Sequence, residues 1–408
     1  MQKMAKRQLT VLPMIWRLLM WLLSASLLAV LTACGTDPGV GTGLPTSTPE
    51  STGTISVATA TPVPGRAAIP LTSIRMLNAT SGWALSETDI LKTQDGGLHW
   101  KSLRQIQVGG LDAQPQGAFM DSNHAWVAYH DAQGPNGTFT ILRTTDGGAS
   151  WQNSNISSAL DGISTPHFVN TQWGWIEAYH FQGMHHTSGE LFRTNDGGVS
   201  WSLIANTDAQ PQTGLTNGGN GLSFKDTQNG WITGEIPSSR AFLETTGNGG
   251  DAWHAQSLPI PDGLTSESVG DTITTPPVFF GNDGLLPVSL FSNETDFDMY
   301  ITHDGGRTWA AQPLARLDMN QNGDASIDNI YVLTMNQSWM NAKTGFYGST
   351  DGGKTWHHLS DLPQPIGKMS FVDATHGWAI GTRSNKNPLL LATSDGGKTW
   401  QQMNYTLQ

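Results

Sequence analysis

The segment Thr393-Ser-Asp395-Gly-Gly-Lys-Thr-Trp400 is one of seven copies of a short motif, Thr/Ser-x-Asp-Gly-Gly-x-x-Trp, which is called the box below. The aspartate position recurs every 44 to 56 residues. It is occupied by Asp95, Asp146, Asp196, Asn248, Asp304, Asp351 and Asp395. The copies end at Trp100, Trp151, Trp201, Trp253, Trp309, Trp356 and Trp400. A period near 50 residues predicts seven repeats of one structural unit.

A second motif, Phe-x-Asp/Asn-x-x-x-Gly-Trp or a close variant, precedes the boxes. Full copies end at Trp83, Trp126, Trp175, Trp231 and Trp378. A weaker copy runs from Thr334 to Trp339, and the fifth copy, around Phe280-Gly281-Asn282, has no tryptophan. Each repeat therefore carries two tryptophan motifs, with one exception.

The last repeat indicates what each unit is. Residues 368–372, 378–382 and 389–393 alternate or are apolar, and Trp400 opens a further short run. Turn residues separate these runs, which predicts a four-stranded antiparallel sheet. One such sheet cannot bury both faces, so neighbouring sheets must stack in a closed ring. We predict an all-β, seven-bladed β-propeller. No blade borrows an outer strand from the other end of the chain in this scheme, so we expect side-chain packing to close the ring.

The box has a mechanical interpretation. Its aspartate can accept hydrogen bonds from backbone N–H groups of its own turn. Its paired glycines allow positive φ angles in a tight hairpin, and its tryptophan can bury a large ring between adjacent sheets. We therefore expect the box residues to be structural.

The box resembles the Asp-box, or BNR repeat, of sialidases and sortilin-type receptors. In those families the box lies on the periphery of the propeller, which implies a structural role. The pairing of both motifs over residues 71–403 is similar to the photosystem II assembly and stability factor family. The propellers of that family are non-catalytic protein-binding scaffolds, so the resemblance implies a binding function.

The N-terminus predicts targeting and anchoring. Residues 1–33 hold four basic and no acidic residues, and an apolar run over 18–30 ends in Leu31-Thr-Ala-Cys34. This pattern has the length of a secretory signal and resembles the lipobox of bacterial lipoproteins, which implies a lipid on Cys34. The alternative is an ordinary signal peptide with a chance cysteine. We assign 1–33 to the signal, 34–66 to a lipidated cysteine with a disordered linker rich in Ser, Thr, Pro and Gly, and 67–408 to the propeller.

Composition limits the partners. The chain has 33 acidic and 21 basic residues, a net charge of −12 and a single cysteine. An acidic chain lacks the basic footprint that nucleic acid requires, and one cysteine excludes a disulfide framework. We expect a lipid-anchored, extracytoplasmic monomer that binds a protein, peptide or glycan. The acidic surface favours a cationic or neutral partner.

Few residues suggest a ligand site. The candidates are Arg75 on the first inner strand, Tyr129, His180 and Arg240. We expect the insertions 129–140 and 179–191 to project from one rim and contact the ligand. Arg143 and Arg193 occupy the same position of two repeats, which indicates a repeat feature. We assign no catalytic residue and expect no cofactor.

Three alternatives stay open. A sialidase-like glycoside hydrolase would need three arginines, such as Arg75, Arg240 and Arg383, to converge beside a tyrosine–glutamate pair. A purely structural surface protein would have no ligand. A calcium loop would use Asp318, Asn320, Asn322 and Asp324, although position twelve is Asn329 rather than glutamate, which favours a polar hairpin. The histidines at 180, 185 and 186, with His124 and His130, are expected to be solvated loop residues rather than metal ligands.

Overall fold

The computed structural model describes residues 69–408 except 110–113, 133–136, 184–185, 210–214, 216–220, 237–241, 266–271, 292–294, 317–326, 362–365 and 383–387. This part of the chain consists of strands and turns and contains no helix. It accordingly offers no helix that is long and apolar enough to traverse a bilayer. The signal, Cys34 and the linker lie outside the described residues.

The strands form seven antiparallel sheets. Blade 1 contains β1 (Leu71–Met76), β2 (Gly82–Ser86), β3 (Asp89–Thr93) and β4 (His99–Gln105). Blade 2 contains β5 (Gln116–Phe119), β6 (Ala125–His130), β7 (Thr138–Thr144) and β8 (Gln152–Ser157). Blade 3 contains β9 (Gly162–Ile163), β10 (His167–Phe168), β11 (Gly174–Gly183), β12 (His186–Thr194) and β13 (Ser202–Asn206). Blade 4 contains β14 (Gly221–Phe224), β15 (Gly230–Thr233), β17 (Leu243–Thr246) and β18 (His254–Ala255).

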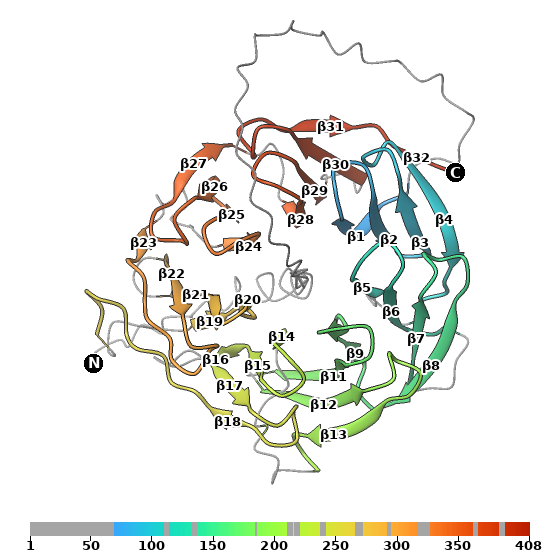
Figure 1. Cartoon of the computed structure of the whole chain (residues 1–408), viewed down its shortest axis with the longest axis horizontal. Coiled ribbons are helices and arrows are strands. Elements are labelled where there is room, and N and C mark those ends of the chain that lie inside the picture. The colour runs from blue at the N-terminus through green and yellow to red at the C-terminus, as the bar shows by residue number, and fades with distance from the viewer. Residues whose placement is uncertain are drawn as a thin grey trace, which may run out of the picture.

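The remaining blades complete the ring. Blade 5 contains β19 (Thr272–Thr274), β20 (Val278–Phe280), β21 (Asp283–Phe291), β22 (Thr295–Thr302) and β23 (Ala315–Arg316), and β16 (Glu235–Ile236) crosses from blade 4 to pair with β19. Blade 6 contains β24 (Ile327–Val332), β25 (Ser338–Ala342), β26 (Gly345–Ser349) and β27 (His357–Ser360). Blade 7 contains β28 (Ile366–Phe371), β29 (Gly377–Thr382), β30 (Pro388–Thr393) and β31 (Gln401–Met403). The predicted all-β, seven-bladed β-propeller is confirmed, and its blades surround a centre lined by the first strand of each repeat (Figure 1).

Ring closure differs from our expectation. The last strand, β32 (Thr406–Leu407), adds to the outer edge of blade 1 and pairs in parallel with β4. Gln408 N donates to Trp100 O at 2.8 Å, and the Tyr405 hydroxyl donates to Ile69 O at 2.6 Å. The two ends of the described chain are therefore joined by backbone hydrogen bonds as well as by side chains. The repeat pattern ends at the last box, so it gave no signal for this short strand.

Prolines divide two of the inner strands. Pro166 separates β9 from β10, and Pro276 and Pro277 separate β19 from β20, while both pieces of each pair bond to the same neighbour. Proline lacks the N–H that a continuous ladder needs, which explains both breaks. In blade 5 the turn between the first two strands is shorter. Phe279, rather than the Phe280 of the sequence motif, therefore pairs with the glycine near the start of the second strand, as Phe168 pairs with Gly174 in blade 3.

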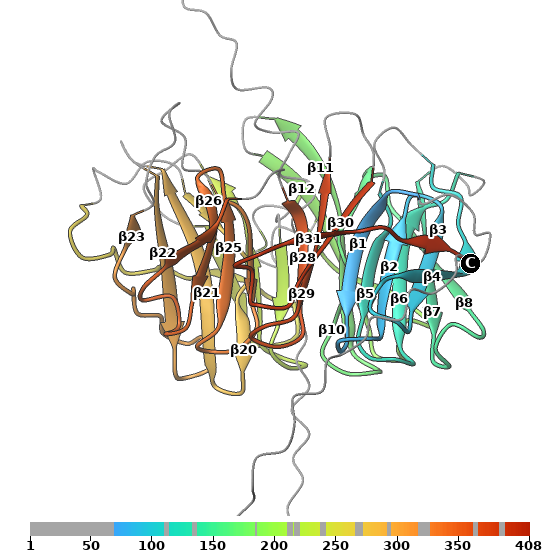
Figure 2. The same ribbon diagram turned by 90° about the horizontal axis from the view of Figure 1, so that it is seen from above.

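The two faces of the ring differ. In every blade the first glycine of the box donates its N–H to the turn between the first two strands, as Gly197 N does to Gln172 O at 2.8 Å. We call this side the box face. The opposite side, the loop face, carries the other connections, and there β11 and β12 rise above their neighbours (Figure 2).

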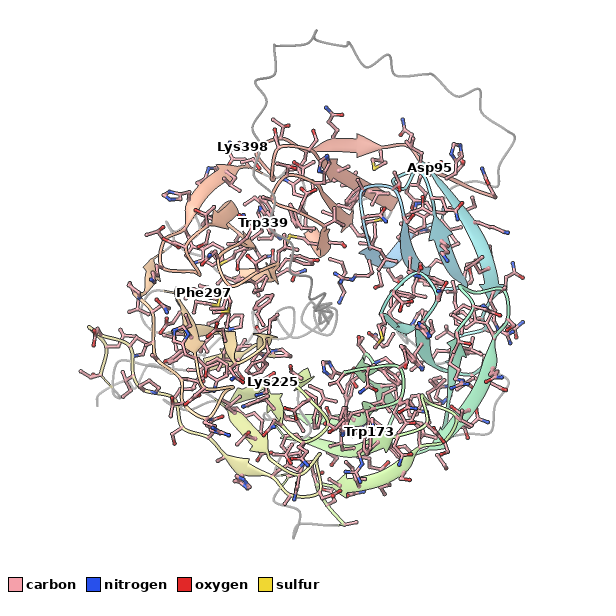
Figure 3. All side chains as sticks on the ribbon, in the orientation of Figure 1. Asp95, Trp173, Lys225, Phe297, Trp339 and Lys398 are labelled. Carbon is pink, nitrogen blue, oxygen red and sulfur yellow. The ribbon has the colours of Figure 1, made fainter. Side chains whose placement is uncertain are left out.

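The core lies in the layers between blades. Five tryptophans of the Gly-Trp motif are deeply buried: Trp83, Trp126, Trp175, Trp231 and Trp339 are at most 2% exposed. Each of these five rings packs on the motif aromatic or apolar residue of the next blade, as Trp126 stacks on Phe168 at 3.7 Å. Box tryptophans lie edge-on beside the same residue, as Trp201 does. Figure 3 places Trp339 between the blades, whereas Asp95 of a box lies near the outer edge.

Candidate functional site

The boxes form a repeated corner at the periphery. Thr144 Oγ1 donates to Asp146 Oδ1 at 2.8 Å and accepts from Gly148 N at 2.9 Å. Asp146 Oδ1 also accepts from Ser150 N, and its Oδ2 accepts from Ser150 Oγ. Both box glycines have positive φ in all seven copies, a conformation that glycine adopts without steric cost. All the donors that bond to the Asp146 carboxylate come from its own hairpin.

These bonds stabilise the charged form of the box aspartates. Bonds from Ser150 and Thr144 lower the pKa of Asp146 to about 2. Bonds from Thr308 lower the pKa of Asp304 to about 2, and bonds from Thr399 do the same for Asp395. A catalytic acid needs a pKa near the working pH, so these carboxylates are suited to holding hairpins and not to moving protons.

The degenerate box keeps the hairpin without a charge. Asn248 Oδ1 accepts from Thr246 Oγ1 at 2.8 Å and from Ala252 N at 2.9 Å. The other boxes have a hydroxyl or a histidine where this one has Ala252, so the partner of the second carboxylate oxygen is lost together with that oxygen. The turn keeps the conformation of the other boxes because Asn248 Oδ1 accepts the same two hydrogen bonds as the Oδ1 of a box aspartate.

The inner strands carry two tiers of side chains on the side of each strand that borders the centre of the ring, and most first-tier side chains are buried. The first tier pairs with the tryptophan of the Gly-Trp motif, or with Leu285 in blade 5. It consists of Arg75, Ala118, His167, Ser223, Val278, Tyr331 and Ser370. The second tier lies two residues earlier, nearer the loop face, and consists of Ser73, Gln116, Thr165, Gly221, Pro276, Asn329 and Lys368. Alternation along a strand places the two tiers on the same side.

Three neighbouring blades join through the first tier. Arg75 Nη1 donates to the Tyr331 hydroxyl at 3.0 Å, and that hydroxyl donates to Phe371 O at 2.8 Å. Met76 N donates to Ser370 Oγ at 2.9 Å. Arg75 is half-buried, so its guanidinium spans blades 1 and 6 beside blade 7.

The second tier supplies further polar groups. Thr165 Oγ1 donates to Gln116 Oε1 at 2.9 Å, and Asn329 Nδ2 donates to Gly367 O at 2.8 Å. Burial lowers the pKa of Lys368 to about 8, so the ammonium is still mostly protonated at neutral pH. Neither tier contains an aspartate or a glutamate. Arg75 and Lys368 therefore make blades 7 and 1 the cationic part of the two tiers, with Lys368 only 9% exposed, although the chain as a whole is acidic.

His167 occupies the first tier of blade 3 but is closed off from the centre. It is 8% exposed, and its Nε2 lies 2.8 Å from Phe224 O and 3.0 Å from Phe224 N. Burial lowers its pKa to about 4, and the bond to Phe224 opposes this shift only in part. His167 is thus a neutral tie between blades 3 and 4 at physiological pH.

The structure separates those predicted ligand residues that it describes. Arg75 lies on the channel wall as described above. Tyr129 is buried at 6% exposure in the layer between blades 1 and 2; it faces the core and not a ligand. Its apolar neighbours on alternate positions of the sequence would have indicated this. Arg240 lies outside the described residues.

Two of the described histidine candidates, His124 and His180, lie in different blades. His180 lies on β11, in a regular hairpin and not in the loop that we predicted, and its Nδ1 is 2.9 Å from Asp161 Oδ1. His124 pairs with Asp121 in a different blade. Asp318, Asn320, Asn322 and Asp324 lie outside the described residues, and the described residues contain no cluster of three or more histidine, cysteine or acidic ligands.

Arg143 and Arg193 act alike in successive blades. Arg143 Nη1 donates to Asp196 O and Gly197 O, and Arg193 Nη1 donates to Gly249 O. Each cation thus binds the box of the next blade. The sequence placed Lys368 at the start of an inner strand beside the channel, but sequence reasoning missed Tyr331 and Ser370, which meet blade 1 only when the ring closes.

No protein-family model matches the chain, and no curated protein matches it. Several solved structures share its architecture. YCF48 from Cyanidioschyzon merolae superposes with a TM-score of 0.51 at 18% identity, and YCF48 bound to a D1 peptide superposes with 0.50 at 19% identity. Each alignment covers 82% of this chain and 95% of the YCF48 chain. Sqt1 of Saccharomyces cerevisiae gives 0.52 at 12% identity, covering 84% of this chain and 86% of Sqt1.

What these proteins share with the chain is the propeller fold. Identities this low do not transfer a ligand or an activity, because propellers host many unrelated functions. The function must therefore be argued from the residues on the channel wall.

Proposed function

We propose that the chain is a lipid-anchored, extracytoplasmic propeller that binds a protein or peptide at the loop-face mouth of its channel. The observation that carries this proposal is the composition of the two tiers. Arg75 and Lys368 supply positive charge, hydroxyls and amides supply hydrogen bonds, and no carboxylate lies among them. Groups of this kind bind carboxylates and backbone carbonyls of a peptide.

Two further points support a binding role. The sequence resembles a family of non-catalytic protein-binding propellers, and YCF48, which has the same fold, has been solved bound to a D1 peptide. The loop face also carries the long β11–β12 hairpin beside the mouth, whereas the connections of the box face are short and fixed by repeated hydrogen bonds.

A sialidase-like glycoside hydrolase is less well supported. Glycoside hydrolysis generally requires two carboxyl groups across the scissile bond, and the two tiers contain none. Two of the three arginines that it would use, Arg240 and Arg383, lie outside the described residues. A panel of chromogenic glycosides incubated with the purified chain separates the two functions, since turnover that requires a carboxylate near the mouth would favour the enzyme.

The binding proposal is tested by substitution of Lys368 with methionine, which keeps the buried stem and removes the charge. We expect short peptides rich in Asp and Glu to bind the full chain more tightly than their Asn and Gln counterparts. Lys368→Met should weaken that binding by about tenfold or more, the effect of losing a hydrogen bond between charged groups. Fluorescence anisotropy near physiological salt measures it, because charges elsewhere on the chain are screened beyond ~8 Å.

Lys354→Met is the matched control, because Lys354 lies in a box and is exposed on the other face. Equal affinity of wild type and Lys368→Met for both peptide sets would refute a channel site. The anchor is tested separately: Cys34→Ser should leave folding intact and release the protein from membranes, and a variant that still sediments with membranes would refute lipidation.

A further inference from the structure

The seam between blades 4 and 5 contains a buried carboxylate with incomplete hydrogen bonding. Asp298 lies on β22, four residues before the box residue Thr302, and is 0% exposed. Its Oδ1 accepts from Gln312 N at 3.1 Å, whereas its Oδ2 has no partner among the described residues. A buried charge in this situation is costly because it lacks the hydration that water would give it.

Blade 1 offers a matched position. Asp89 also lies four residues before its box threonine and is 0% exposed. Thr88 Oγ1 donates to its Oδ2 at 2.6 Å, and Ser102 Oγ donates to its Oδ1 at 2.7 Å. Both oxygens are satisfied in blade 1, so the fold accommodates a carboxylate here when hydroxyls are supplied. Blade 5 supplies none.

The surroundings of Asp298 are apolar. The cluster on this side of the blade consists of Trp231, Leu243, Leu286, Val288, Leu290, Tyr300 and Trp309. Tyr300, on the same face of β22, is a titratable group that interacts with Asp298, and Asp296 stands two positions earlier on the same strand. Glu244 follows Leu243 on β17 and so points to the opposite face of blade 4. Asp283 pairs with His303 at the far end of β21, and Asp262 is exposed.

Burial therefore raises the pKa of Asp298 to about 7, and the bonds from Gln312 and Met299 oppose this only in part. β15, β17, β21 and β22 and the segments 256–264 and 309–314 contain no lysine or arginine. On the strand paired with β22, Arg316 of β23 stands opposite Asp296, two positions before Asp298. The carboxyl group titrates near neutral pH because its environment favours the uncharged form.

A covering segment lies over this seam. Residues 256–264, called the strap, place Leu258 and Leu264 against the apolar cluster. The Tyr300 hydroxyl donates to Pro259 O at 2.7 Å, and Gln256 Nε2 donates to Gly306 O at 2.8 Å. The strap is thus held by a few side-chain bonds and by the backbone bond from Gln256 N to Leu243 O at 2.8 Å. One of the side-chain bonds comes from the residue two positions after Asp298.

We propose that Asp298 is a proton-controlled latch: its protonated carboxyl keeps the strap and blades 4 and 5 packed, and its ionisation loosens them. Because the pKa of Asp298 is raised in the folded chain, the stability of the fold falls as pH rises. The stabilisation is complete below the pKa of an unfolded aspartate and is lost as pH rises through the folded pKa. Across that interval each pH unit lowers the folding equilibrium constant about tenfold relative to a variant that cannot ionise.

Hydrogen exchange of the strap amides in the full chain tests the latch, from about pH 5 to about pH 8 with correction for intrinsic rates. Wild-type protection should fall by about tenfold per pH unit up to neutrality. In Asp298→Asn it should be independent of pH, and in Asp89→Asn it should fall as in the wild type. Wild-type pH dependence in Asp298→Asn would overturn the proposal.

A second measurement reports the ionisation of the carboxyl group directly. Titration of the carboxyl carbons in selectively labelled wild type should show one aspartate that ionises near neutral pH, and its signal should be absent from Asp298→Asn if that variant folds. If every aspartate ionises below about pH 5, as ordinary aspartates do, the latch does not exist.

Discussion

Two neighbouring seams of the ring use the same motif in different ways. Between blades 3 and 4, Trp175 donates to Gly249 O at 2.9 Å and stacks on Phe224 at 3.7 Å with planes 6° apart. Between blades 4 and 5, Trp231 occupies the same position but meets Phe279 at 4.5 Å and 32°. Its indole N–H reaches Gln256 Oε1 instead of a box glycine.

The difference has a cause in one outer strand. Gln256 stands three residues after the box tryptophan, where blades 1 to 3 have Leu103, Ser154 and Ile204 and blade 5 has Gln312. Its amide donates to two carbonyls of the next box, Gly306 O and Arg307 O, and so replaces the direct indole bond by a relay. Because the box at the direct seam is the degenerate one with Asn248, a box carboxylate is not what makes a seam regular. The glycine carbonyl and the facing side chain decide the geometry.

Removing the indole of the direct seam should have the largest effect. We expect Trp175→Ala to destabilise the chain by ~3–5 kcal/mol, because removal of a fully buried ring leaves a cavity and Gly249 O keeps only its bond from Arg193. Chemical denaturation measures this loss. A cost below that of Trp231→Ala would mean that the direct seam is the weaker of the two.

The two seams should also respond to pH with opposite signs. His167 of the direct seam has a pKa lowered to about 4, so its contribution is complete above the unfolded value and is lost as pH falls towards the folded value. Relative to His167→Gln, the wild type should lose about 3 kcal/mol between about pH 6.5 and about pH 4. Thermal melts of both proteins across this range measure the difference, and a constant difference would show that His167 is not buried in the neutral form.

The relay should have a smaller and specific cost. Gln256→Ala removes the acceptor of Trp231 Nε1 and should destabilise the chain by ~1–3 kcal/mol, the cost of a buried unsatisfied donor. The fluorescence of Trp231 should shift towards the blue if its N–H loses its partner. Ile204→Ala, at the same position of the direct seam, is the control that loses packing without breaking an indole bond; equal spectra for both variants would argue against the relay.

Restoring the degenerate box should change stability least. Asn248→Asp combined with Ala252→Ser rebuilds the oxygen and its hydroxyl partner and should add about 1 kcal/mol at neutral pH. Asn248→Asp alone should add less because Ala252 cannot donate to the new oxygen. The gain should disappear as pH falls towards about 2, where the box aspartates of other blades protonate. A gain that persists in acid would come from some other contact.

Much of the fold could be predicted from sequence because its signals are local. The box bonds join residues two to four positions apart, as Thr144, Asp146 and Ser150 show. Strand boundaries in the last repeat follow from alternation and turn residues in the same way. Hydrogen bonds between residues a few positions apart form within one turn and do not depend on the surrounding structure.

The candidate site could be predicted only in part. Arg75 was recognised on the first inner strand, but its contact with Tyr331 joins residues 256 positions apart. Tyr129 looked like a ligand residue because its strand precedes an insertion, yet its side chain faces the layer between blades. A tyrosine at a strand end gives no local indication of which neighbour it will meet.

The sequence by itself determined the number of repeats, the four strands of each and the hairpins of the boxes, since all of these depend on spacing within one repeat. Only the tertiary structure decided that β32 closes blade 1, that Gln256 rather than a glycine carbonyl receives Trp231, and that Asp298 lacks the hydroxyls that Asp89 has. Each of these depends on which side chains two neighbouring blades bring to one seam. That pairing is set by the register and closure of the whole ring, and no window of the sequence contains it.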